Sequence, residues 1–275
     1  MRSCIEHTVT SGASGRKHNK THAYAKINGL LKCPLNVSTI ALGLHGSGMT
    51  LWYADRCGII EVDLESDQFL HQQAVLGLSN LSTIRDPCVT VHRLKPHRIF
   101  KFTLHNNVYY GVYDSRGEPL YIADGIACRG TLVLLGLCAT GYLDDEDAGF
   151  GKASDSEIVA IKLSHPSVPW AIEFLQQDNT ADVWKHEWQV LQSLNANRVR
   201  NVPELFDHIE HASSTKTIRQ TVGLQNKRHR TRTILVTRPL ADLTLQKKIE
   251  RGIELPELVQ VMRDIIDGTR LLKSR

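Results

Sequence analysis

Short apolar runs begin at Val37, whereas the first 25 residues of the chain show no apolar periodicity. Those residues are rich in Ser, Gly, Thr, Lys and His. Such a composition buries too little apolar surface to offset the chain entropy that is lost on folding. We therefore expect a disordered tail over residues 1–25.

Residues 26–115 have the pattern of an N-terminal α+β segment. Two apolar runs, 51–53 and 59–62, flank the sequence Asp-Arg-Cys-Gly at 55–58. Because Asp and Gly favour turns, this arrangement predicts a β-hairpin. Later in the segment, Ser66 and Asp67 can cap a helix. That helix is expected to run to about residue 78, and strands are expected at 98–104 and 108–113.

Residues 116–240 carry most of the remaining strand patterns. The clearest amphipathic helix covers residues 182–194, where Val190 and Leu194 belong to an apolar stripe. Strands grouped around one helix, followed by helices alone over residues 241–275, predict an α+β fold. The expected strands are 119–123, 126–128, 131–135, 157–163, 204–209 and 233–237.

Two helices are expected in residues 241–275. One covers about 243–251, and a longer one begins at Pro256, a residue favoured in the first turn. Its apolar positions include Leu258, Met262 and Ile265. An apolar helix face without a partner favours association, so we expect the chain to be poorly soluble when expressed alone.

The composition is that of an ordinary globular protein, with 41% hydrophobic and 23% charged residues among 275. A net charge of +4 is too small to indicate nucleic acid as a partner. No apolar run is long enough for a membrane span, and no secretory signal opens the chain. The six cysteines lack the C-x-x-C spacing of a metal site. We expect a soluble, intracellular protein with reduced thiols.

Lys162 ends the sequence Val-Ala-Ile-Lys at 159–162. Alternate residues of a strand share a face, so Lys162 lies beside Ile158 and Ala160. Protein kinases use such a lysine as a fixed ammonium between the nucleotide phosphates and a carboxylate on a neighbouring helix. A surface lysine at the end of a strand is the alternative interpretation.

Glu187 is the candidate partner of Lys162. It lies one helical turn after Val183 and one turn before Leu191, on or beside the apolar stripe. A carboxylate in that position favours a cationic partner, and the preceding strand supplies one. A glutamate at the rim, paired with Lys185 or solvated, is the alternative.

Residues 129–133 contain Arg-Gly-Thr before Val133, a candidate for the glycine turn that covers phosphates in a kinase. Of the usual three glycines, Gly130 alone is present. A plain hairpin turn fits these residues equally well.

Several motifs occur in a fixed order along the chain. They are Leu-Trp-Tyr-Ala-Asp-Arg-Cys-Gly at 51–58, Arg-Asp-Pro at 85–87, Arg-Gly-Thr at 129–131, Val-Ala-Ile-Lys at 159–162, Trp-x-x-Glu-Trp at 184–188, Arg-Pro-Leu at 238–240 and Val-Met-Arg-Asp-Ile-Ile-Asp-Gly at 261–268. From about residue 40 onward, this order resembles the fungal-type protein kinase family of mushroom-forming fungi.

The resemblance implies a protein-kinase-like small lobe over residues 116–240, with a five-stranded sheet and one helix, and the start of the large lobe over residues 241–275. It implies an ATP site with Lys162 and Glu187 as the catalytic ion pair. It further implies Gly130 and Thr131 at the phosphates, Val133 and Ala160 around the adenine, and Thr237 and Arg238 at the hinge between the lobes.

The sequence departs from the family where phosphoryl transfer takes place. A kinase needs an H-R-D Asp as base and a D-F-G Asp for Mg²⁺, and neither tripeptide occurs here. We expect no metal ligands in this chain and no kinase turnover by it. The rival hypotheses are a non-catalytic, pseudokinase-like binding module and a small-molecule phosphotransferase with the same lobe architecture. The protein substrate is not indicated.

Three other patterns fall short of a site. Residues 43–50 have the spacing of a Walker loop, but Met49 replaces its lysine. The acidic loop 144–155 has Ala148 where a calcium ligand is needed. The stretch 211–241 has seven Lys or Arg residues and no acid, and it lacks the interleaved aromatic residues of a nucleic-acid surface.

Overall fold

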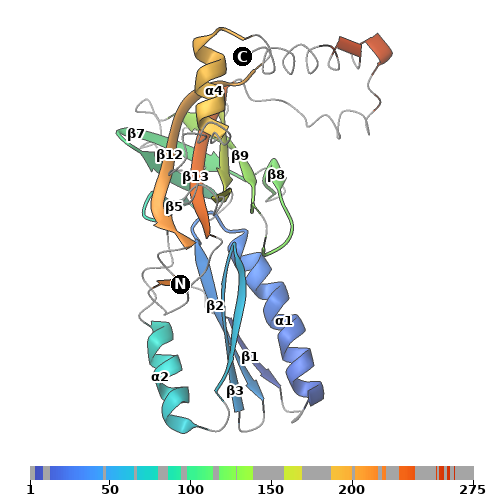
Figure 1. The fold of residues 1–275 in the computed structure, drawn as a ribbon, viewed down its shortest axis with the longest axis vertical. Coiled ribbons are helices and arrows are strands. Elements are labelled where there is room, and N and C mark those ends of the chain that lie inside the picture. The colour runs from blue at the N-terminus through green and yellow to red at the C-terminus, as the bar shows by residue number, and fades with distance from the viewer. Residues whose placement is uncertain are drawn as a thin grey trace, which may run out of the picture.

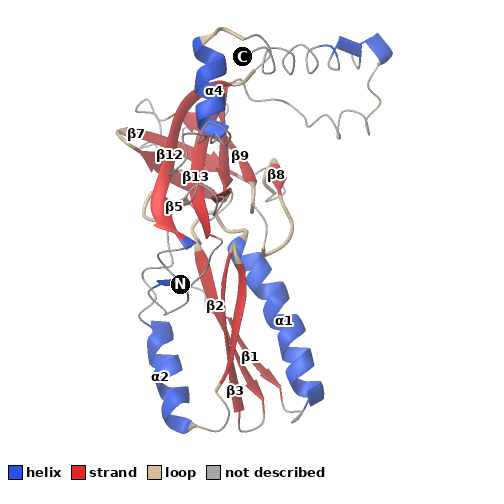
Figure 2. Cartoon of the chain, viewed as in Figure 1, coloured by secondary structure: helices blue, strands red, loops and turns tan. Residues whose placement is uncertain are grey.

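Two mainly antiparallel sheets with few helices make up the computed structural model, which confirms the α+β class (Figures 1 and 2). The structure describes residues 4–8, 13–45, 48–64, 67–79, 86–93, 98–113, 118–127, 129–138, 158–168, 187–199, 202–215, 219–220 and 229–238, with isolated positions at 252, 254–256, 259–260 and 263. The predicted loop 144–155 and helix 243–251, and most of the helix from Pro256, lie outside these residues.

The smaller sheet has the order β1 (Cys4–Thr8), β2 (Ser38–His45), β3 (Gly48–Asp55) and β4 (Gly58–Asp63). Strand β1 is parallel to β2, and the other neighbours are antiparallel. The hairpin predicted at the Asp-Arg-Cys-Gly turn is confirmed as β3–β4. At the end of this turn Gly58 has a φ of 132°, a conformation that favours glycine.

The prediction of a disordered tail over residues 1–25 is wrong. Strand β1 and helix α1 (Ala13–Leu31) lie there, and Figure 1 shows α1 along the small sheet. In α1, Ala23, Ile27 and Leu31 recur every four residues and are buried against a cluster that includes Trp52. This narrow stripe is enough to dock a helix whose composition is otherwise polar.

Helix α2 (Gln68–Ser79) also begins as predicted. The Asp67 carboxylate accepts hydrogen bonds from the backbone N–H groups of Phe69 and Leu70, at 2.9 and 3.1 Å. This is the geometry of an N-terminal cap. Phe69 is 66% exposed, so the start of α2 is held by its cap rather than by burial of that side chain.

The larger sheet extends beyond the predicted lobe. Its described strands are β5 (Val89–Arg93), β6 (Ile99–Leu104), β7 (Asn107–Val112), β8 (Tyr121–Ile122), β9 (Leu132–Cys138), β10 (Ile158–Ser164), β11 (Ser167–Val168), β12 (Glu204–Ser214) and β13 (His229–Arg238). The main order is β11-β13-β10-β9-β7-β6-β5, with β12 beside β13 and β8 beside β9.

Strand β7 pairs directly with β9, so the predicted domain boundary between residues 115 and 116 does not separate two sheets. The side chains of β6, β7, β9, β10 and β13 share one core, in which Phe102, Leu134 and Ile161 are fully buried. The predicted strand at 126–128 is also wrong, because residues 126 and 127 form a bend. That expectation came from a run of apolar residues without alternation.

The large sheet curls until β12 meets the β6–β7 turn. Asp207 on β12 accepts hydrogen bonds from Asn107 Nδ2 and from the Tyr109 hydroxyl, at 2.9 and 2.8 Å. Burial raises the pKa of Asp207, but these hydrogen bonds outweigh burial and hold the pKa below its usual value. The ionised carboxylate of Asp207 therefore holds β12 against the β6–β7 turn.

A buried ion pair joins the small sheet to the segment between β12 and β13, and a second one lies within the large sheet. Asp55, at the end of β3, accepts two hydrogen bonds from the Arg219 guanidinium, at 2.7 and 2.8 Å. Asp86, just before β5, lies 2.6 Å from Arg232 Nε on β13. All four residues are buried. The two hydrogen bonds from Arg219 to Asp55 are directional contacts to the small sheet, whereas the Asp86–Arg232 pair lies within the large sheet. No helix in the described part of the chain is both long and apolar enough to cross a membrane.

Candidate functional site

Strand β10 presents Lys162 on the outer face of the large sheet. Val159, Ile161 and Leu163 point into the core and are at most 2% exposed. Lys162 lies on the face of β10 opposite to these three residues, and its side chain is 28% exposed. Its cross-strand neighbours are Val133 on β9 and Leu235 on β13.

Helix α4 (Glu187–Ala196) brings Glu187 to this lysine. The helix packs on β12, where Asn195 Oδ1 accepts a hydrogen bond from the Leu205 backbone N–H at 2.7 Å. Trp188 stacks on the His208 ring with 4.3 Å between ring centroids. Docked in this way, α4 places Glu187 Oε1 as the acceptor of a hydrogen bond from Lys162 Nζ.

The contact predicted between Lys162 and Glu187 is therefore present in the structure. The described helix begins at Glu187, and Val183 and Trp184 lie outside the described residues. Alternation along β10 indicated the lysine, and helical spacing indicated the glutamate, because both are local patterns.

Arg129 is a second cation at Glu187 that the sequence did not indicate. Its guanidinium lies 3.6 Å from Glu187 Oε2, so the carboxylate has a positive group near each oxygen. The Arg129 side chain is 57% exposed, and water screens this contact. No local pattern links the residue before a glycine turn to a helix that follows much later in the chain.

Three of the residues assigned to ATP share the face of Lys162. Val133 pairs with Lys162, and Ala160 pairs with Thr237 on β13. Leu135, the other cross-strand partner of Ala160, lies on the same face and was missed. Val133, Leu135 and Ala160 are each half-buried, so together they form an apolar strip beside the lysine.

Arg238 does not join this group. It follows Thr237 on β13 and therefore points to the other face. Its guanidinium donates hydrogen bonds to the Glu204 carboxylate at 2.7 and 3.2 Å, and it lies 4.7 Å from the centre of the Phe206 ring. The side chain of Arg238, which was predicted at the hinge, thus links β13 to β12.

Gly130 faces Arg56 of the β3–β4 turn. It is buried with a φ of 53°, and a Cβ atom there would collide with the Arg56 guanidinium. The Thr131 carbonyl accepts a hydrogen bond from the Ala123 N–H at 2.8 Å, which closes the β8–β9 turn. The structure packs Gly130 against Arg56 of the β3–β4 turn, and its assignment to a phosphate-covering turn stays a prediction.

Within the described residues, no three His, Cys, Asp or Glu side chains are grouped as a metal would need. The geometry therefore supplies a cation, a carboxylate and an apolar strip, but no set of Mg²⁺ ligands. Comparison of the chain with protein-family models, with curated proteins and with solved structures finds no match in any of the three.

Proposed function

We propose that the outer face of the large sheet binds ATP as a protein-kinase-like small lobe does. The observation that carries the proposal is the ion pair between Lys162 on β10 and Glu187 on α4. In protein kinases the corresponding lysine lies on the third strand and pairs with a glutamate of a helix.

The order of the strands supports this proposal. The strands β7, β9, β10, β13 and β12 are neighbours in that order, and each pair is antiparallel. Lys162 lies on the third of the five. Among the described residues, helix α4 lies in the chain between β10 and β12 and packs on β12. This order of strands agrees with the five-stranded lobe with one helix that the resemblance implies, and β5 and β6 extend the sheet beyond it.

The chemistry of the outer face suits a nucleotide. The ammonium of Lys162 is held by Glu187, and the Lys162 side chain is 28% exposed, so we expect that phosphate oxygens can approach it. Val133, Leu135 and Ala160 offer apolar contact to a flat base. A half-exposed ion pair contributes little to stability, so this pair has more use in binding than in folding.

The proposal includes membership of the fungal-type protein kinase family, on the collinear motifs described above. It is confined to nucleotide binding, because neither H-R-D nor D-F-G occurs in the 275 residues. ATP is the proposed ligand, and no step is assigned to Mg²⁺.

A non-catalytic binding module is the second candidate, and Arg129 favours it. With Arg129 at one oxygen of Glu187 and Lys162 at the other, the three residues can act as a clamp that holds α4 on the sheet. In that case ATP would not compete for the lysine. Lys162 would then matter for stability rather than for affinity.

Calorimetric titration with ATP, with and without Mg²⁺, distinguishes the two candidates. Replacing Lys162 by Met removes a charged hydrogen-bond donor, and we expect ATP affinity to fall about tenfold or more. Lys101→Met is the matched control, because Lys101 is another half-buried lysine of the large sheet, on β6. Equal affinity in the wild type and both variants, or no ATP binding by the wild type, would reject nucleotide binding at this site.

A further inference from the structure

Arg129 lies at the end of the proposed ATP site that is remote from the apolar strip. Ala160 pairs with Leu135 in that strip, and Lys162 follows two residues later on β10. Beyond Lys162, the backbone N–H of His165 donates to the Arg129 carbonyl at 2.6 Å. The apolar strip, the ammonium of Lys162 and then Arg129 therefore follow one another in the direction of β10.

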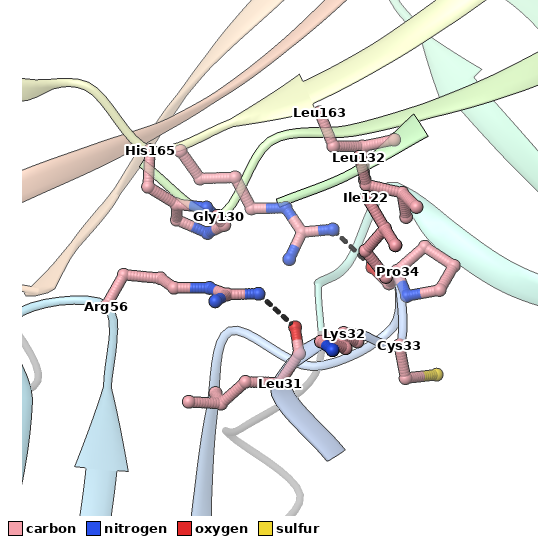
Figure 3. A pocket seen from close by; sticks show the side chains of 11 residues that line it. Leu31, Lys32, Cys33, Pro34, Arg56, Ile122, Gly130, Leu132, Leu163 and His165 are labelled. Carbon is pink, nitrogen blue, oxygen red and sulfur yellow. Dashed lines mark hydrogen bonds between the residues drawn. The ribbon is translucent and has the colours of Figure 1, made fainter. Parts of the chain in front are cut away.

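The backbone at Arg129 is held from the inner side of the large sheet. His165, which binds the Arg129 carbonyl, is 3% exposed, and Gly130 is buried as well. His165 and Gly130 both line the small polar cavity where the two sheets meet, and Gly130 faces Arg56 there (Figure 3). The Arg129 side chain, in contrast, is exposed. It therefore extends outward from an anchored backbone, and less conformational freedom is lost when it binds a ligand.

Two cations share the carboxylate of Glu187. Lys162 Nζ donates a hydrogen bond to Oε1, and the Arg129 guanidinium lies 3.6 Å from Oε2. The three groups together carry an excess of positive charge, which favours an anionic ligand. Because both cations contact one carboxylate, they lie close enough together to contact neighbouring phosphates of one chain.

The contact of Arg129 with Glu187 is the weaker of the two. Its 3.6 Å exceeds the length of a charge-assisted hydrogen bond, about 2.7–2.9 Å, and the side chain is 57% exposed to water. A phosphate can accept two parallel hydrogen bonds from one guanidinium. Phosphate oxygens are therefore better partners for Arg129 than the carboxylate at this distance.

We propose that Arg129 binds the terminal phosphates of the nucleotide and makes the site selective for nucleoside triphosphates over monophosphates. This inference rests on the proposed ATP site and adds to it the residue that recognises the length of the phosphate chain. With the base on the apolar strip, the first phosphate reaches Lys162, and further phosphates extend past it to Arg129. The single phosphate of AMP ends at Lys162.

Calorimetric titration of Arg129→Met with ATP and with AMP tests this role. Methionine removes the cation and keeps an unbranched side chain, so we expect ATP affinity to fall about tenfold while AMP affinity changes little. Arg129→Lys keeps the charge without the planar fork and should recover part of the loss. Arg93→Met is the matched control, because Arg93 is an exposed arginine on β5, at the edge of the same sheet. It should bind both nucleotides as the wild type does.

The possible results separate the role of Arg129 from the ATP site itself. No ATP binding by the wild type, or full ATP affinity in Lys162→Met, would reject the site and the role of Arg129 with it. Weaker ATP binding in Lys162→Met alone, with wild-type affinity in Arg129→Met, would overturn the role of Arg129 and leave the site. Equal losses of ATP and AMP affinity in Arg129→Met would show that Arg129 acts only through Glu187, and the proposed selectivity would be overturned.

Discussion

At the scale of single residues, burial decides the role of the charged and polar groups where the two sheets meet. Gly130, Arg56 and His165 are remote from one another in the sequence and touch or share one cavity in the fold. Lys162 lies three residues before His165 but points to the opposite, half-exposed face. The end of β10 and the residue after it thus contribute to the buried core with one face and to the proposed ATP site with the other.

Gly130→Ala is expected to destabilise the protein by about 1–3 kcal/mol. An alanine at this position is strained by the positive φ, and its Cβ would also displace the buried Arg56 side chain. Gly58→Ala is the control, because Gly58 also has a positive φ but nothing lies within 4 Å of its added Cβ. Urea unfolding should show the larger loss for Gly130→Ala. Equal losses would show that contact with Arg56 adds nothing.

The stability of the protein should fall on mild acidification because of His165. Burial, and then the charges of Arg232, Arg56 and Arg230, lower the pKa of His165 well below its usual 6.5, although the Arg129 carbonyl opposes the shift. The unfolded chain therefore binds a proton below about pH 6.5 that the folded chain does not. The free energy of unfolding falls by at most about 1.4 kcal/mol per pH unit from this group.

The measurement is urea unfolding of wild type and His165→Leu at several pH values between about 7 and 5. The variant should show a shallower dependence on pH than the wild type. His92→Leu is the control and should follow the wild type, because its side chain is exposed. Identical slopes in wild type and His165→Leu would contradict the burial of a neutral imidazole.

At the scale of elements, the curl of the large sheet depends on two glycines that face each other across β7 and β9. Gly111 pairs with Gly136, and an added Cβ at Gly136 would lie 2.6 Å from Ile161 Cγ1. The inner layer is filled by large side chains from β6 and β10, so the absence of a side chain at this pair makes room for them.

Gly136→Ala should therefore cost about 1–3 kcal/mol of unfolding free energy through overpacking. Gly29→Ala in α1 is the matched control, because nothing lies within 4 Å of its added Cβ. In a helix this change favours folding by about 0.5–1 kcal/mol. Calorimetric melting should move Tm in opposite directions for the two variants. A neutral Gly136→Ala would contradict the account of the curled core.

Helices and strands whose own residues carry a turn, cap or periodic pattern could be predicted from the sequence. Those that depend on pairing or packing with distant segments could not. The β3–β4 turn has its Asp and Gly, and α2 has its Asp67 cap, so both were expected. Helix α1 was missed because its buried stripe is narrow and its composition polar. The pairing of β7 with β9 was missed because the sequence does not specify which strands become neighbours.

The same distinction applies to the candidate site. Lys162 followed from the Val-Ala-Ile-Lys motif on a strand, and Glu187 followed from the period of a helix. The Arg129 contact to Glu187 and the Arg56 contact to Gly130 join distant segments, and only the fold reveals them.

At the scale of the whole molecule, the buried Asp55–Arg219 ion pair ties the small sheet to the segment between β12 and β13. Removing one partner of such a pair leaves an uncompensated charge. Asp55→Ala should lower the free energy of unfolding by about 3–5 kcal/mol, because Arg219 would lose both of its hydrogen bonds to Asp55. Glu204→Ala, in the exposed pair with Arg238, is the control and should change stability little. Similar small losses in both variants would contradict the fastening role of Asp55.

The most direct test of nucleotide binding is affinity labelling with an acyl-phosphate derivative of ATP. The deprotonated ε-amine of a lysine next to the bound phosphates attacks the acyl carbonyl of this reagent, an amide forms and ATP leaves. Mass spectrometry of peptides then identifies that lysine. We predict that Lys162 is labelled and that excess ATP protects it, while Lys101 is not labelled selectively. Labelling of other lysines in preference to Lys162, or labelling of Lys162 that ATP does not reduce, would contradict the proposed site.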